Sequence, residues 1–301
     1  MTLRLGTRRS LMATTQSQMV ADAYTERTGR DIELVGITTF GDVSRAHLAQ
    51  LGGTGVFVSA LRDKLFEGEI DFAVHSLKDL PTKPDPRMTL AALPARHDHR
   101  DALVGPVAFA DLPAGAKVGT GSPRRVAMLR AMRPDLEYVP IRGNADTRIG
   151  KVTSGELDAV VLAAAGLTRI GRTAEIAQIF EVEELTPAPG QGSLAVECLS
   201  DRGDLIDFLG VLDDPRTRSA VAAERTILSD LEAGCSAPVG AFALDDGQTL
   251  NLTAVVVALD GQRAIRKSAA GSPSEAVDLA RVLAAEMIAE GADRLMGEHS
   301  H

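Results

Sequence analysis

Short apolar segments alternate with helical patterns along the N-terminal part of the chain, and this alternation restricts the fold more than any other feature. Residues 3–6, 32–38 and 70–74 have the pattern of buried strands. Residues 11–25 and 57–65, which lie between them, have the apolar spacing of amphipathic helices. Strands separated by helices pair in parallel, because each helix carries the chain back to the start of the next strand. We therefore predict an α/β unit built on a parallel sheet.

The same alternation returns after residue 100 and predicts a second α/β unit. Its expected strands are residues 117–120, 136–141 and 157–163, each followed by a turn into a helix. Residues 194–198 form a further apolar strand, which we interpret as the return of the chain to the first unit. Two β-α units joined by two crossings are the layout of periplasmic-binding-protein-like domains, with a cleft between them.

The C-terminal segment has a different pattern and predicts a smaller α+β domain. A strand at 250–259 is followed by the capping-box residues Ser272 and Glu275 and by a long amphipathic helix that ends near Met296. The predicted fold class is therefore α/β, with two periplasmic-binding-protein-like domains, a cleft between them and a small C-terminal α+β domain. The expected boundaries are 1–96 with 190–212 for domain 1, 97–189 for domain 2 and 213–301 for domain 3.

The composition excludes several classes of protein. Hydrophobic residues make up 45% and charged residues 24% of the chain, the balance of a soluble globular protein. The longest apolar runs, such as residues 159–165, are too short to span a bilayer, and no signal-peptide core precedes the first strand. Two cysteines cannot build a disulfide framework, which suits a reducing compartment. We expect a cytoplasmic protein without a membrane partner.

The net charge of −9 is unevenly distributed along the chain. Residues 91–172 contain ten Arg and two Lys against eight acidic residues and carry +4, so the remainder carries −13. A basic segment within an acidic protein indicates a local anion site rather than a surface for polyanions. Trp is absent and no recognised nucleic-acid motif occurs, so nucleic acid is not expected as a partner.

Arginine recurs where the strand patterns of the second unit end. The strand at 117–120 leads into Ser122, a favourable N-cap for the helix that follows. The ends of parallel strands meet at one edge of a sheet, and arginine binds carboxylates through paired hydrogen bonds. These positions therefore predict a pocket for several carboxylates. The arginines that follow the three strand ends are Arg124, Arg125, Arg142, Arg148 and Arg169.

The first unit offers two comparable positions and a loop. Arg8 and Ser10 stand between a strand and a helix, whose N-terminus attracts anions, and Ser10 suits the N-cap. Lys78 and Asp79 follow the third strand, where open α/β sheets hold their ligands. Two opposite charges there form either a solvated ion pair or a reactive site. Residues 39–55 contain four glycines and little apolar periodicity, which predicts a mobile lid.

Candidate nucleophiles and metal ligands are few. Cys198 lies in an apolar strand and is expected to be inert core. Cys235 lies in a Gly-Cys-Ser turn, where its thiol is either a buried loop residue or a nucleophile within reach of an electrophile. His97 and His99 flank Asp98 without a third ligand nearby, so we interpret them as polar loop residues and expect no metal.

Nine short motifs distributed over nearly the whole chain together resemble those of porphobilinogen deaminase, also called hydroxymethylbilane synthase. They are Gly6-Thr-Arg8, Gly52-Gly-Thr-Gly-Val-Phe57, His75-Ser-Leu-Lys-Asp-Leu-Pro81, Arg100-Asp-Ala, Gly119-Thr-Gly-Ser-Pro-Arg-Arg125, Arg142-Gly-Asn144, Thr147-Arg148, Pro189-Gly-Gln-Gly192 and Glu232-Ala-Gly-Cys-Ser-Ala-Pro-Val-Gly240. The chain departs from the family at Thr54 and Ser59, where many members have lysine.

The resemblance implies an enzyme that condenses four porphobilinogen molecules head to tail, with loss of ammonia each time, and then hydrolyses off hydroxymethylbilane. It implies a dipyrromethane cofactor joined by a thioether to Cys235, with Asp79 as the catalytic carboxylate. We expect a monomer whose partner is porphobilinogen. The cofactor-binding residues are expected to be Cys235, Lys78, Asp79, Ser122, Arg124, Arg125, Gly143 and Arg148. The substrate-binding residues are expected to be Arg8, Ser10, Phe57, Arg142, Arg148, Arg169 and Gln191.

A non-catalytic anion-binding module with the periplasmic-binding fold is the alternative hypothesis. Such a module explains a cleft lined by arginine. It does not require Asp79 or Cys235, so a covalent adduct on Cys235 distinguishes the two.

Overall fold

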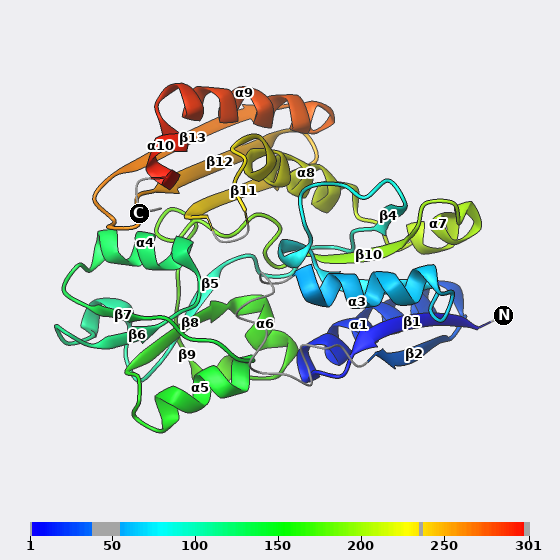
Figure 1. Cartoon of the computed structure of the whole chain (residues 1–301), viewed down its shortest axis with the longest axis horizontal. Helices are drawn as coiled ribbons and strands as arrows, with labels where there is room; N and C mark the ends of the chain where they lie inside the picture. The colour runs from blue at the N-terminus through cyan, green and yellow to red at the C-terminus, as the bar shows by residue number, and fades with distance from the viewer. Residues whose placement is uncertain (1, 38–54, 235–236, 298–301) are drawn as a thin grey trace. The chain divides into compact units, whose positions relative to one another are not determined.

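The computed structural model describes residues 2–37, 55–234 and 237–297, and the described chain divides into two compact units. One comprises Met1–Arg96 and Ser193–Arg218, and the other comprises His97–Gly192 and Ser219–His301. Figure 1 labels the helices and strands of both units. The second unit contains the whole of the predicted second domain and the predicted third domain from residue 219 onward. The three-domain division and the cleft between domains therefore stay predictions.

The first unit is built on a five-stranded mixed sheet. Its strands are β1 (Leu3–Arg8), β2 (Ile32–Ile37), β3 (Phe72–Ser76), β4 (Met88–Ala92) and β10 (Leu194–Leu199), in the order β2-β1-β3-β10-β4. β1 pairs in parallel with β2 and β3, as the alternation of strands and helices predicts. β10 pairs antiparallel with β3 and β4, which confirms the predicted return strand.

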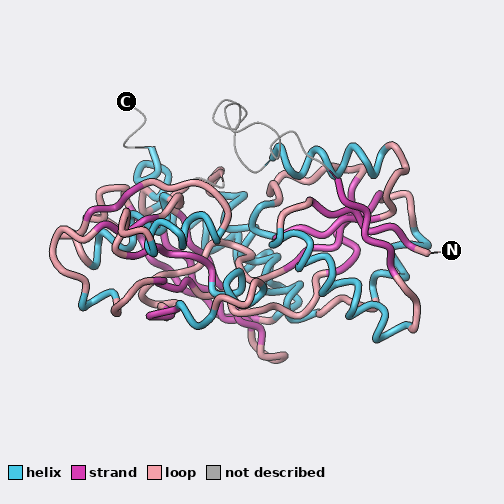
Figure 2. The backbone as a smooth tube through the Cα atoms, turned by 90° about the horizontal axis from the view of Figure 1, so that it is seen from below, coloured by secondary structure: helices cyan, strands magenta, loops and turns pink. Residues whose placement is uncertain are grey.

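Helices cover both faces of this sheet (Figure 2). Successive residues of a strand point to opposite faces, so Phe72 and Ala73 belong to different hydrophobic cores. α1 (Leu11–Thr28) and α7 (Gly203–Gly210) pack in the core that contains Phe72. α3 (Gly55–Phe66) packs in the core that contains Ala73.

The second unit contains a five-stranded sheet with the same arrangement. Its strands are β5 (Asp101–Val104), β6 (Lys117–Gly119), β7 (Glu137–Val139), β8 (Ala159–Ala163) and β9 (Ile176–Ile179), in the order β7-β6-β8-β5-β9. β6 is parallel to β7 and β8, whereas β5 is antiparallel to β8 and β9. The fourth position of each sheet is thus an antiparallel strand, and the predicted class of two mixed β-α sheets is confirmed. α4 (Pro123–Met132), α5 (Ala145–Thr153) and α6 (Ala164–Arg169) follow β6, β7 and β8 in turn.

A three-stranded antiparallel sheet forms the C-terminal part. Its elements are α8 (Pro215–Asp230), β11 (Val239–Asp245), β12 (Leu250–Val257), β13 (Ala264–Gly271), α9 (Ala276–Ala289) and α10 (Ala292–Gly297). On β12, Ala254 and Val256 face the core shared with these helices, while Val255 joins the core of the second sheet. The prediction of one continuous helix to Met296 is wrong, because Gly291 adopts a φ of 95° and separates α9 from α10.

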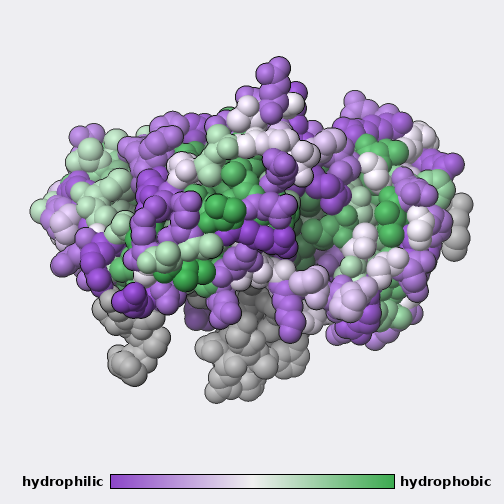
Figure 3. All heavy atoms as spheres, turned by 90° about the horizontal axis from the view of Figure 1, so that it is seen from above, coloured by the Kyte–Doolittle hydropathy of each residue, from purple (hydrophilic) through white to green (hydrophobic). Residues whose placement is uncertain are grey.

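The surface shows no extended hydrophobic region on the face seen in Figure 3, where hydrophobic residues form small groups among hydrophilic ones. Val282 and Ile288 on α9 are examples of exposed apolar side chains. Within residues 2–37, 55–234 and 237–297, no helix is both long enough and apolar enough to cross a membrane.

A buried carboxylate on β10 joins three elements of the first unit. Glu197 accepts hydrogen bonds from Nε and Nη2 of Arg62 on α3 at 3.1 and 2.7 Å. Nε2 of His75 on β3 lies 3.3 Å from the same carboxylate, without the alignment of a hydrogen bond. Burial raises the pKa of Glu197, but the contacts with His75 and Arg62 outweigh burial, so the pKa lies below its usual value.

Glu197→Gln tests this network. Near neutral pH we expect the free energy of unfolding to fall by about 3 kcal/mol, the lower end for a broken buried ion pair, because Arg62 keeps some access to water. The pKa of Glu197 is lower in the folded than in the unfolded protein. The stabilisation that ionised Glu197 contributes is therefore complete above about pH 4.5 and is lost as the pH falls through the pKa of the folded state. Urea unfolding of both proteins at several pH values measures the difference, and a difference that grows on acidification would contradict the assignment.

Candidate active site

Asp79 lies on a short, anchored turn at the carboxyl edge of the first sheet. β3 continues directly into the 3-10 helix η1 (Leu77–Asp79). Leu77 and Leu80 are buried and anchor this turn, and the amide of Leu80 donates to the carbonyl of Leu77 at 3.1 Å. Lys78 and Asp79 are half-buried between these anchors. Both charges therefore lie at a strand end, as expected, while their roles stay a prediction.

A cavity of about 120 Å³ opens beside Asp79. Arg8 from the end of β1 and Ser10 from the start of α1 lie on its wall together with Asp79 and His75. A cation, a helix N-terminus and a carboxylate therefore surround one small space. The complete lining consists of Arg8, Ser10, Met12, Ala13, Gln16, Val58, Leu61, Val74, His75, Ser76 and Asp79.

Hydrogen bonds fix the polar residues around this cavity. Ser10 is the N-cap of α1, as predicted, and its Oγ accepts from the amide of Ala13 at 3.4 Å. Gln16 is buried on α1 and donates from Nε2 to Oγ of Ser76 at 2.9 Å. A capping hydroxyl can still donate its hydrogen to an anion, and the N-terminus of α1 favours negative charge. The cavity thus suits a ligand that carries a carboxylate.

A larger cavity of about 240 Å³ lies at the opposite edge of the same sheet, where β1 and β3 begin. Its charged residues are Arg4, Asp71 and Arg202, of which Arg4 and Asp71 form an ion pair at 3.0 Å. No residue predicted for catalysis lines this cavity. The smaller cavity is therefore the candidate site.

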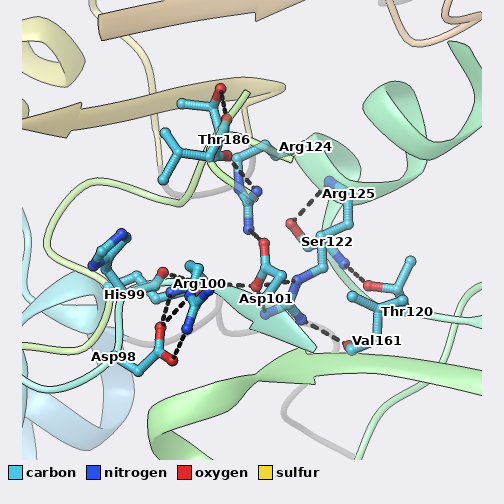
Figure 4. Close-up of polar contacts among 12 residues, drawn as sticks. Asp98, His99, Arg100, Asp101, Thr120, Ser122, Arg124, Arg125, Val161 and Thr186 are labelled. Carbon is cyan, nitrogen blue, oxygen red and sulfur yellow. Dashed lines mark hydrogen bonds and ion pairs between the residues drawn. The ribbon is translucent and has the colours of Figure 1, made fainter. Parts of the chain in front are cut away.

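In the second unit, Arg124 and Arg125 lie at the start of α4, buried around one carboxylate (Figure 4). Asp101, the first residue of β5, accepts from Nη2 of Arg124 at 2.7 Å and from Nε and Nη2 of Arg125 at 3.0 and 2.6 Å. Arg124 also donates to the carbonyl of Thr186 at 2.6 Å, and Arg125 donates to the carbonyl of Val161 at 2.9 Å. We call Asp101, Arg124 and Arg125 the Asp101 cluster. Contact between its arginines and a cofactor carboxylate stays a prediction.

The turn before α4 has the capping chemistry that the sequence predicts. Oγ of Ser122 accepts from the amide of Arg125 at 3.4 Å, and Pro123 occupies the first turn of the helix. The amide of Ser122 donates in turn to Oγ1 of Thr120 at 3.3 Å. The N-cap prediction for Ser122 is confirmed, and the cap places both arginines at the start of the helix.

The turn between β7 and α5 carries a different pair of arginines. Arg142 is exposed, and Arg148 is half-buried and donates from Nε to the carbonyl of Gly143 at 2.8 Å. Gly143 adopts a φ of 113°, and a Cβ there would lie 3.0 Å from the side chain of Thr147. Glycine is therefore required at this turn. Arg142 differs from the cluster arginines because its guanidinium faces solvent.

Arg169 and Gln191 meet at the turn that precedes β10. Nη2 of Arg169 donates to the carbonyl of Gly192 at 2.7 Å. Gln191 is completely buried, and its Nε2 donates to Oδ1 of Asp101 at 2.8 Å and to the carbonyl of His99 at 2.9 Å. Burial lowers the pKa of Arg169 to about 10. This turn therefore links Arg169 to the Asp101 cluster.

Several predicted residues lie outside the described part of the chain. Cys235, the side chain of Phe57 and most of the predicted lid belong to them. Cys198 is described, and it is buried in the core on β10, as predicted. Burial raises the pKa of its thiol to about 11, which keeps the thiol neutral near pH 7. Among the residues that the structure describes, no group of three or more His, Cys, Asp or Glu side chains could hold a metal.

Asp101 is the site residue that sequence reasoning did not single out. The residues just before it were interpreted as a polar loop, and no strand was expected there, whereas Asp101 begins the antiparallel strand β5. Its partners lie 23 and 24 residues further along the chain. The only sequence signal for it was its place in the Arg100-Asp-Ala motif.

Two family models match most of the chain, and both describe the same family. A family model described as porphobilinogen deaminase, dipyromethane cofactor binding domain, matches residues 3–207. A second model, porphobilinogen deaminase, C-terminal domain, matches residues 219–289. Among solved structures, the methionine binding protein MetQ aligns with 70% of this chain and 89% of its own at 10% identity and a TM-score of 0.45. The VFT2 domain of Bordetella pertussis BvgS aligns with 69% and 85% at 16% identity and a TM-score of 0.41.

The alignments with relatives of high sequence identity span almost the full length of this chain and of each relative. A porphobilinogen deaminase of Thermobifida fusca is 58% identical over 306 residues, which span 98% of this chain and 96% of the relative. Porphobilinogen deaminase 1 of Streptomyces coelicolor is 58% identical over 313 residues, 99% of this chain and 98% of the relative. These matches confirm the resemblance inferred from the nine motifs. The chain belongs to the porphobilinogen deaminase family, enzymes of tetrapyrrole biosynthesis with a dipyrromethane cofactor.

Proposed function

We propose that this chain condenses four porphobilinogen molecules head to tail on a covalently bound dipyrromethane primer, loses ammonia at each step, and releases hydroxymethylbilane by hydrolysis. The observation that carries the proposal is the meeting of Asp79, Arg8 and the N-terminus of α1 at one cavity. A non-catalytic anion-binding module does not need that carboxylate. We further propose that the enzyme acts as a cytoplasmic monomer without a metal.

The residues of the second unit fit a cofactor that carries carboxylates. Each pyrrole ring of the primer and of the growing chain bears an acetate and a propionate. Among the described residues, Nε of Arg124 and Nε of Arg169 are buried without a hydrogen-bond partner. Buried N–H groups in that state are rare, and an anionic oxygen satisfies them. The donor set therefore suits several carboxylates of one elongated ligand.

The family resemblance suggests a division of roles, which we propose for this chain. Cys235 carries the thioether, and residues at the turns of the second unit hold the primer: Ser122, Arg124, Arg125, Gly143 and Arg148. Lys78 and Asp79, which lie on η1, also bind the primer. The groups proposed for incoming porphobilinogen are Arg8, Ser10, Phe57, Arg142, Arg148 and Arg169. Gln191 lies in the turn whose Gly192 carbonyl binds Arg169, and it donates to Asp101, so we propose that it supports substrate binding by fixing that turn.

Asp79 supplies the charge that the reaction requires. When bound, the primer supplies the terminal pyrrole ring to which the first substrate unit is joined. Loss of ammonia from porphobilinogen leaves a cationic azafulvene, and a fixed carboxylate beside a cation lowers the barrier to its formation. The buried neighbours Leu77 and Leu80 keep the carboxylate in place. Asp79 also holds pyrrole N–H groups and accepts a proton after the new bond forms.

The first prediction concerns the attachment of the cofactor. Cys235→Ser should give protein that lacks the adduct mass and activity, whereas Cys198→Ser should keep both, because Cys198 is enclosed in the core of the first unit. Intact-mass spectrometry and peptide mapping of the two purified variants make the test. An adduct on the Cys198 peptide would refute the assignment.

The second prediction uses the exposure of Arg142. Arg142→Leu removes an exposed guanidinium and should leave the thermal melting temperature nearly unchanged. It should lower kcat/KM for porphobilinogen by about 10- to 100-fold, the effect of one lost charged hydrogen-bonding contact. The adduct on Cys235 should remain complete. Arg130→Leu is a suitable control, because Arg130 donates to the carbonyl of Leu259 and has no predicted role in substrate binding.

The third prediction separates charge from shape at Asp79. Asp79→Asn keeps the size of the side chain but removes its charge, and Asp79→Glu keeps the charge but moves it by one methylene. If electrostatic stabilisation dominates, Asn should lose far more turnover than Glu, with the fold and the adduct intact. Steady-state formation of hydroxymethylbilane, measured beside thermal melts, distinguishes the variants. Near-normal turnover in Asp79→Asn would remove this residue from the mechanism.

A further inference from the structure

Asp101 is a fully buried carboxylate that three side chains enclose (Figure 4). Its Oδ1 accepts from Nε and Nη2 of Arg125 and from Nε2 of Gln191, and its Oδ2 accepts from Nη2 of Arg124. The donor distances lie between 2.6 and 3.0 Å. One carboxylate thus fixes two guanidiniums at once.

The Asp101 cluster does not balance its own charge. Both arginines stay protonated in proteins, because the guanidinium pKa is about 12 or higher. Within the described residues, neither guanidinium has an ion-pair partner other than Asp101. The cluster therefore retains one positive charge in a buried position, which is costly unless a ligand compensates it. Burial lowers the pKa of Arg124, in keeping with this imbalance.

Backbone groups complete the orientation of both arginines. Nη1 of Arg124 donates to the carbonyl of Thr186, and Nη1 of Arg125 donates to the carbonyl of Val161. Nε of Arg124 remains without a partner among the described residues. An arginine side chain has many rotamers in solution, and fixing them before a ligand arrives removes that entropic cost from binding. Both arginine side chains are thus held in place before a ligand binds, and the cluster lacks one negative charge for neutrality.

We propose that Asp101 is the positioning residue of the cofactor site: it orients Arg124 and Arg125 and leaves their cluster with one positive charge, which takes one carboxylate of the primer. This inference rests on the proposed function, because it assumes that the two arginines bind that primer. Asp101 itself does not touch the primer. Its carboxylate lies between the two guanidiniums and offsets part of their mutual repulsion, so the two arginines can lie side by side.

Asp101→Asn is the direct test, made in the full chain. Asparagine has one oxygen where aspartate has two, so one of the two guanidiniums loses its acceptor and meets the N–H₂ group, which is itself a donor. Protein produced in cells that make no porphobilinogen is mixed with porphobilinogen, and the adduct mass on Cys235 is followed with time. We expect the adduct to appear about 10-fold more slowly or worse than in the unaltered chain. Adduct formation at the unaltered rate in folded Asp101→Asn protein would overturn the proposal.

Asp71→Asn is the matched control. Asp71 is a largely buried carboxylate that pairs with Arg4 at 3.0 Å, near the opposite edge of the first sheet from Asp79. Its loss should lower the melting temperature but leave the rate of adduct formation unchanged. A similar slowing in both variants would show that loss of stability alone slows loading, and the positioning role would be withdrawn.

A second measurement needs no change at Asp101. In Cys235→Ser protein, which cannot hold the primer, ¹⁵N signals of the Arg124 and Arg125 side chains report rotation about the guanidinium bonds. Arg124→Lys and Arg125→Lys variants assign the signals. Slow rotation in the absence of the primer supports the proposal, and fast rotation of both overturns it even if Asp101→Asn fails to fold. The proposed function fails separately, if the unaltered chain gains no adduct. Adduct formation at the normal rate in Arg124→Leu/Arg125→Leu protein would instead overturn the assignment of the two arginines to the primer, and this inference with it.

Discussion

A buried carboxylate on the antiparallel strand of each five-stranded sheet binds arginine from a neighbouring helix, and both units depend on this interaction. In the first unit, Glu197 on β10 pairs with Arg62 on α3. In the second unit, Asp101 on β5 pairs with Arg124 and Arg125 on α4. Each pair ties the antiparallel strand of a sheet to a helix of the parallel part, although β10 returns from a distant part of the chain whereas β5 begins its unit. Breaking such a buried pair typically costs about 3–5 kcal/mol, a large share of the stability of a domain.

The features that the sequence predicted are those set by neighbouring residues. Ser10 and Ser122 cap their helices because a side-chain oxygen reaches an amide three residues ahead, whatever the tertiary fold. The parallel pairing of β1, β2 and β3 follows from strands separated by helices. The position of Asp79 directly after β3 could also be predicted, because it depends only on where that strand ends.

The features that were missed depend on partners far away in the sequence. β5 pairs with β8 and β9, which lie far along the chain, so nothing local to β5 or β9 shows this pairing. β13 mixes small and charged residues without a regular apolar alternation, and its sequence does not distinguish it from a loop. The cluster arginines were expected to face a ligand, because they follow a strand end where carboxylates can bind, yet most of their donors bind groups of the protein. The sequence near residue 101 does not indicate that its carboxylate pairs with Arg124 and Arg125 and so makes their burial possible.

The two buried carboxylates differ in charge balance, and the difference separates a structural pair from a functional one. Glu197 and Arg62 carry opposite unit charges, so their pair is neutral and requires nothing further to stabilise the first unit. Asp101 faces two guanidiniums, and a fold that needed only stability would be better served by one arginine and an apolar neighbour. The excess charge lies beside the unpartnered Nε of Arg124 and is linked through Gln191 to the turn that Arg169 binds. A site for a ligand carboxylate requires three features: excess positive charge, an unpartnered donor and side chains ordered before the ligand binds. The pair of Glu197 and Arg62 is neutral, so it lacks the excess charge.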